Sequence, residues 1–80
     1  MIFPKKHLKV HETLIAMGAV VLQNTGSPKT LDDLWNVFQD KKIYEGLSFY
    51  TFDRLLLTLV FLRTIGLISL DDNGRIKKCN

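Results

Sequence analysis

The segment 48–66, SFYTFDRLLLTLVFLRTIG, most constrains the fold, because its pattern predicts a helix that is apolar on two sides. When it is wound at about 100° per residue, one broad arc forms an ordinary core face with Phe49, Phe52, Leu55, Leu56, Leu59, Val60 and Leu62. A narrower stripe on the opposite side holds Tyr50, Arg54, Leu57 and Phe61. A small domain can hardly bury both faces by itself, so we expect this stripe to contact another protein. The alternative is that the N-terminal arm or the first helix of the same chain covers it.

The composition is that of a folded chain, since 46% of the 80 residues are hydrophobic and 24% are charged. We predict a single domain over residues 1–80. The net charge of +3 is concentrated at the ends, with +2 over residues 1–12, +3 over residues 75–80 and −2 between them. Contacts with phosphate groups are therefore expected only from the ends. The candidates are Lys5, Lys6, Lys9, Arg75, Lys77 and Lys78.

The cysteine content and the N-terminus favour a soluble, cytoplasmic protein. Cys79 is the single cysteine, so no disulfide can form within the chain, which fits a reducing compartment. The N-terminal residues MIFPKKHLKV lack the apolar stretch of a secretory signal. The longest uncharged run, residues 13–28, is too short and too polar to cross a bilayer.

The first part of the chain is expected to hold an arm, a helix and a turn. Pro4 opposes an early helix, so residues 1–10 are predicted to be extended. A helix should follow over about residues 11–24, with Gly18 and Ala19 leaving a shallow place where another helix can approach. Glycine costs a helix about 1 kcal/mol relative to alanine, which favours a packing reason for Gly18. Residues 24–29, NTGSPK, are rich in turn formers.

Two further helices are predicted from their end signals. Thr30 can cap a second helix, with Asp33 in the reciprocal position of a capping box. Its apolar stripe, Leu31, Leu34, Trp35 and Phe38, is short, and residues 39–47 are expected to be a polar connector. Ser48 or Thr51 would cap the third helix, and Gly66 would end it.

The C-terminal residues predict a β-hairpin. Residues 67–70 alternate in polarity, and Asn73-Gly74 precedes a second strand-like run at residues 75–78. The order is three helices followed by a hairpin, so the fold class is mainly α with a small hairpin. This is the layout of a winged helix-turn-helix domain whose wing is C-terminal.

No arrangement of residues predicts catalysis, a metal site or a bound cofactor. His7 and His11 lack further ligands, and Asp32 with Asp33 is explained by the start of a helix. Residues 71–74 lack the spaced ligands of a calcium loop. We therefore expect a protein that is not an enzyme.

The predicted fold raises the alternative of DNA binding, since winged helices commonly read the major groove with the third helix. Such a helix needs polar donors on its outer face. Here that face offers Arg54 among large apolar groups, which is typical of the centre of a protein interface. The residues therefore favour a protein partner.

The chain also resembles a known family, the small middle components of bacterial ABC-three-component conflict systems, the group that includes Lamassu-type defence. The resemblance covers essentially the whole chain, and Asp33 stands where the family has Glu. The residues that carry it are Ile2-Phe3-Pro4-Lys5-Lys6-His7, Gly18-Ala19, Thr30-Leu31-Asp32-Asp33-Leu34-Trp35, Phe52-Asp53, Leu59, Leu62, Ile65-Gly66 and Gly74-Arg75-Ile76-Lys77.

The resemblance implies a non-enzymatic adaptor subunit of an anti-phage or anti-plasmid complex. Its partners would be an ABC ATPase related to SMC and Rad50 proteins and a protein that carries an effector domain. Further expectations are a homodimer when the chain is isolated and non-specific DNA contact inside the complex. The alternative function is that of a small winged-helix DNA-binding transcriptional regulator.

Overall fold

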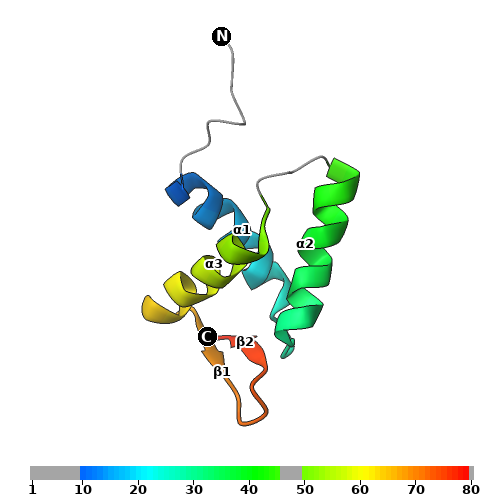
Figure 1. Cartoon of the computed structure of the whole chain (residues 1–80). Coiled ribbons are helices and arrows are strands. Elements are labelled where there is room, and N and C mark those ends of the chain that lie inside the picture. Colours follow the sequence, from blue (N-terminus) through cyan, green and yellow to red (C-terminus); the bar gives the residue numbers. More distant parts are fainter. Residues whose placement is uncertain (1–9, 46–49, 80) are drawn as a thin grey trace.

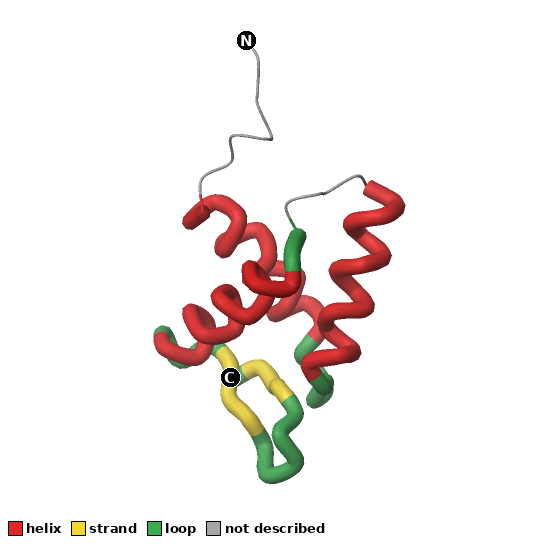
Figure 2. The backbone as a smooth tube through the Cα atoms, in the orientation of Figure 1, coloured by secondary structure: helices red, strands yellow, loops and turns green. Residues whose placement is uncertain are grey.

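The computed structural model describes residues 10–45 and 50–79, and Figures 1 and 2 show three helices followed by a hairpin. The helices are α1 (Val10–Asn24), α2 (Leu31–Glu45) and α3 (Phe52–Thr64). The strands β1 (Ile68–Leu70) and β2 (Ile76–Lys78) pair in antiparallel register, with Leu70 opposite Ile76. The prediction of a mainly helical fold with a small hairpin is confirmed, and the arrangement is compatible with a winged helix. Most of the predicted arm, residues 1–9, lies outside the described residues, and its last residue, Val10, already begins α1.

Helices α1 and α3 cross and pack against each other, with α2 alongside (Figure 1). At Gly18 of α1, an added Cβ would lie 3.4 Å from Cδ2 of Leu62 in α3. The predicted close approach of a helix at Gly18 is therefore confirmed. A polar contact joins the same helices, because the Arg54 guanidinium donates a hydrogen bond to Oγ1 of Thr13 at 3.3 Å.

The hydrophobic core lies between the three helices and is closed at one end by the hairpin. Phe38 of α2 is fully buried, and its ring packs edge-to-face against Tyr50, with centroids 5.1 Å apart. The buried apolar residues are Met17, Val20, Val21, Leu34, Phe38, Tyr50, Leu55, Leu62, Ile68 and Ile76. All five elements therefore supply at least one residue to the core.

The start of α2 has the predicted capping box. The Asp33 N–H donates to Oγ1 of Thr30 at 3.1 Å, and the Thr30 N–H donates to Oδ2 of Asp33 at 3.2 Å. The shorter aspartate thus makes the reciprocal bond. The predicted connector is wrong over residues 39–45, because α2 continues to Glu45, and residues 46–47 lie outside the described residues. Residues 39–45 include glutamine, lysine and glutamate, which favour helix. The first glycine after the start of α2 is Gly46.

Local hydrogen bonds define both ends of α3. Thr51, rather than Ser48, is its N-cap, and Oγ1 of Thr51 accepts from the Arg54 N–H at 3.2 Å. At the other end, Gly66 has φ +85° and donates to the Arg63 carbonyl at 3.0 Å. The Leu67 N–H donates to the Leu62 carbonyl at 2.9 Å, which completes a Schellman motif. The helix is therefore shorter than the predicted segment 48–66.

Strand β2 is bonded on both sides. Ile76 exchanges backbone hydrogen bonds of 2.9 and 2.7 Å with Lys29, in the loop between α1 and α2. The Lys78 N–H donates to the Thr25 carbonyl in the same loop at 3.1 Å. The hairpin is thus tied to a segment that is distant in sequence, and β1 forms the outer strand.

Two turn carboxylates should make the protein less stable at acidic pH. The Thr30 N–H lowers the pKa of Asp33, and the Arg75 N–H lowers the pKa of Asp71. Both values lie below those of the unfolded chain, so this stabilisation is present above about pH 4 and is lost as the pH falls through the folded-state values. We expect Tm to fall between about pH 5 and pH 2, and to fall less in the Asp33→Asn/Asp71→Asn variant. Parallel curves for the two proteins would show that other groups cause the loss.

Candidate protein-binding surface

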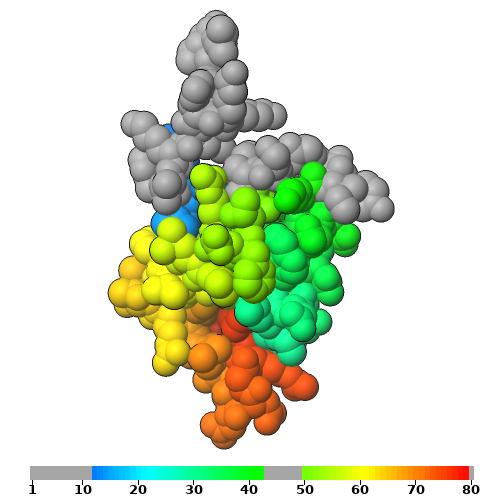
Figure 3. All heavy atoms as spheres, viewed as in Figure 1, coloured from blue at the N-terminus to red at the C-terminus, as the bar shows by residue number. Residues whose placement is uncertain are grey.

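Helix α3 buries only a narrow strip of its surface. Its buried residues are Leu55, Thr58 and Leu62. Its exposed large apolar side chains, between 37% and 62% accessible, are Phe52, Leu56, Leu57, Val60 and Phe61. In Figure 3 the atoms of α3, lime to yellow, lie beside those of α2 and above those of the hairpin.

The predicted core face of α3 is therefore wrong at three positions, Phe52, Leu56 and Val60, and its first member, Phe49, lies outside the described residues. The periodicity marked them as core because they continue the arc of Leu55 and Leu62. The residues that the structure describes leave part of an arc of that width uncovered, as expected for a small domain. The unpaired apolar surface is larger than the sequence predicted.

The exposed side chains form two neighbouring ridges along α3, because residues four apart lie one above the other. One ridge holds Phe52, Leu56 and Val60, and the other holds Leu57 and Phe61. The first ridge begins beside α2, where the Phe52 ring meets Trp35 edge-to-face with centroids 5.3 Å apart. We call these five residues the α3 outer face. Two parallel ridges can interdigitate with the side chains of another helix.

The stripe predicted from the sequence is only partly on this surface. Tyr50 lies before α3, is 5% exposed and packs against Phe38, so its predicted place on the helix is wrong. Arg54 is half-buried and contacts Thr13, so α1 covers this part of the stripe. Leu57 and Phe61 remain exposed. The missed signal was Thr51, because a helix capped there leaves Tyr50 out of the helical repeat.

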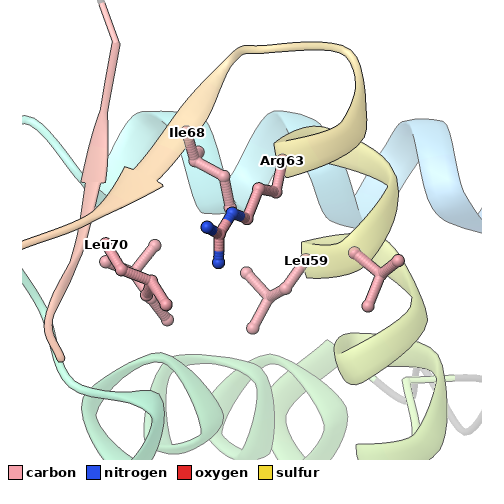
Figure 4. A pocket seen from close by; sticks show the side chains of 6 residues that line it. Leu59, Arg63, Ile68 and Leu70 are labelled. Atoms are coloured by element: carbon pink, nitrogen blue, oxygen red, sulfur yellow. The ribbon is translucent and has the colours of Figure 1, made fainter.

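A pocket of about 180 Å³ lies between α3 and the hairpin, where the first ridge ends. Figure 4 shows the Arg63 guanidinium between Leu59 and Leu70. No described acidic side chain forms an ion pair with Arg63. The lining residues are Leu59, Val60, Arg63, Ile68, Leu70 and Ile76. Sequence reasoning missed this site, because it combines one helix with two strands.

The chain was also compared with known proteins. The family model described as ABC-three component (ABC-3C) system Middle Component 6 matches residues 3–79. The chain belongs to this family. The predicted resemblance to the ABC-3C middle components is confirmed, and the membership suggests an adaptor that works with other components of an ABC-3C system. No curated protein and no solved structure matches the chain.

Only some of the residues predicted to contact phosphate lie in the part of this middle component that the structure describes. Arg75, Lys77 and Lys78 are exposed on and beside β2, whereas Lys5, Lys6 and Lys9 lie outside the described residues. Within the part of the chain that the structure describes, no group of three or more His, Cys, Asp or Glu residues is placed to hold a metal ion. None of the described helices is long and apolar enough to cross a membrane.

Proposed function

We propose that this middle component is a non-enzymatic adaptor of a bacterial anti-phage or anti-plasmid complex. It would bridge an SMC/Rad50-like ABC ATPase and a protein that carries an effector domain, as in Lamassu-type systems. The observation that carries the proposal is the α3 outer face, with its five exposed apolar side chains. These side chains adjoin one another along the helix. A contiguous apolar patch of this kind, unlike single exposed apolar residues, is typical of a protein interface.

The composition of the same face argues against sequence-specific reading of DNA by α3. Arg63 is a charged donor at one edge of the exposed surface, and Asp53 is a carboxylate near its start. Five apolar groups cannot hydrogen-bond to base edges, and a carboxylate repels phosphate. Arg75, Lys77 and Lys78 on the hairpin could still make accessory phosphate contacts inside the complex.

Charge substitutions on α3 test the adaptor function. Leu57→Asp or Phe61→Asp would place a carboxylate in an interface, which costs about 2 kcal/mol or more and corresponds to at least about 30-fold weaker binding. The measurement is co-purification with the co-expressed ATPase and third component, followed by titration of the purified proteins. The matched control is Ile15→Asp, which makes the same change at an exposed apolar residue of α1.

The variants must remain folded for the result to count, which circular dichroism would verify. Loss of binding for both α3 variants, with normal binding of Ile15→Asp, would support the proposal. If both folded α3 variants bind as tightly as the wild type, this part of the outer face is not the interface. A chain that forms no complex with either component would contradict the adaptor function itself.

A further inference from the structure

The pocket beside the hairpin has the size of one side chain. Its volume of about 180 Å³ is below that of usual small-molecule sites, which measure about 300–1,000 Å³. Its walls are aliphatic side chains of α3, β1 and β2. A pocket of this kind fits a single large apolar anchor, and such anchors dominate the binding energy of protein interfaces.

Arg63 adds a charge requirement to the pocket. Its guanidinium lies between the aliphatic side chains of Leu59 and Leu70 (Figure 4), and no described carboxylate forms an ion pair with it. A planar guanidinium binds a carboxylate through two parallel hydrogen bonds, and this pairing is stronger where water is excluded. A ligand that fills the pocket would therefore carry an acidic group next to its apolar group.

The outer edge of β1 adds a backbone requirement. The Leu67 carbonyl accepts from the Cys79 N–H, and the Asp71 N–H donates to the Arg75 carbonyl, so these groups face β2. Backbone groups alternate sides along a strand, so those of Leu70 point away from β2. Leu70 is 49% exposed, and no described residue bonds to its outer backbone groups. Ile68 is buried, which limits the open edge to Leu70.

We propose that this pocket binds an extended segment of a partner protein. The segment inserts one large apolar side chain, pairs a neighbouring Asp or Glu with Arg63, and bonds to the backbone of Leu70. This proposal rests on the adaptor function and specifies how one partner is held. An apolar small molecule could pack against the aliphatic walls. It would form neither an ion pair with Arg63 nor hydrogen bonds with the Leu70 backbone. Residues 1–9 of the chain itself carry Lys5, Lys6 and Lys9, which suit an arginine-bordered pocket poorly.

Charge reversal at the pocket is the first test. Arg63→Glu should weaken binding of the co-encoded ATPase or third component at least about tenfold, because two carboxylates would then face each other. Lys42→Glu is the matched control, since Lys42 lies in the last turn of α2, and α2 does not line the pocket. We expect it to bind as the wild type does. Equal binding of wild type and Arg63→Glu would overturn the proposal.

Amide hydrogen exchange on the full chain is the second test. The Leu70 N–H should exchange fast in the isolated protein and slowly in the purified complex. The Ile76 and Lys78 N–H groups are internal references, because they already donate to the Lys29 and Thr25 carbonyls. If the complex forms and Leu70 exchanges at its free rate, the proposal is wrong while the adaptor function stands. If no complex forms, the adaptor function fails and the proposal with it.

The same exchange measurement distinguishes two other occupants. Protection of Leu70 in the isolated chain that disappears on dilution would identify a second copy in the pocket. Protection that disappears when residues 1–9 are removed would identify the chain's own N-terminal segment. Either result would overturn binding of a partner segment.

Discussion

Phe38→Ala is expected to remove a large part of the folding stability. Phe38 is fully buried between α2 and the rest of the core, and its ring packs against Tyr50. Removing such a side chain lowers the free energy of unfolding by about 3–5 kcal/mol. The loss combines the apolar contacts that disappear with the cost of the cavity that remains. The total stability of a chain of this length is on the order of 4–12 kcal/mol. Urea denaturation followed by circular dichroism would measure the loss.

Ile15→Ala is the control for Phe38→Ala. Ile15 is 65% exposed on α1, so the same kind of truncation removes little buried surface there. We expect a change within about 0.5 kcal/mol. If Phe38→Ala is as stable as Ile15→Ala, the core does not depend on the contact of α2 with Tyr50.

Gly18→Leu is expected to separate α1 from α3. The Cβ alone would lie 3.4 Å from Leu62, so the remaining atoms of a leucine have no room without movement of a helix. Overpacking of this kind costs about 1–3 kcal/mol and sometimes more. Gly18→Ala should act in the opposite direction, because a 3.4 Å contact is ordinary and alanine favours helix by about 1 kcal/mol.

A double-mutant cycle measures the coupling between positions 18 and 62. In a Leu62→Ala background the neighbouring side chain is shortened, so Gly18→Leu should be less destabilising than in the wild type. Unfolding free energies of the four proteins give the coupling. Independent effects of the two substitutions would mean that the helices do not meet at Gly18.

The local features of the fold could be predicted because short hydrogen-bonding motifs determine them. Thr30 with Asp33, the positive φ at Gly66 and the turn before Gly74 depend on neighbouring residues and were readable in the sequence. The sequence offers two N-caps for α3, since Ser48 and Thr51 can both cap a helix. Choosing between them decides whether Tyr50 belongs to the helix or to the core.

The candidate site could be predicted only in part. Leu57 and Phe61 are exposed on α3, but periodicity placed Phe52, Leu56 and Val60 in the core. Periodicity shows which residues share a face, whereas tertiary contacts decide how much of that face is covered. The pocket needed the pairing of β1 with β2 and the position of Arg63 above them, and no spacing in the sequence reports this.

The attachment of β2 to the loop between α1 and α2 has a mechanical consequence. A hairpin without backbone bonds to the rest of the chain could move as a rigid unit. Here Ile76 and Lys78 form backbone hydrogen bonds with Lys29 and Thr25. Movement of the hairpin away from α3 would require these hydrogen bonds to break, or the loop that leads into α2 to move as well. The wall that β1 and β2 give to the pocket is thus stiff before any ligand arrives, and a ligand would lose little affinity to ordering it.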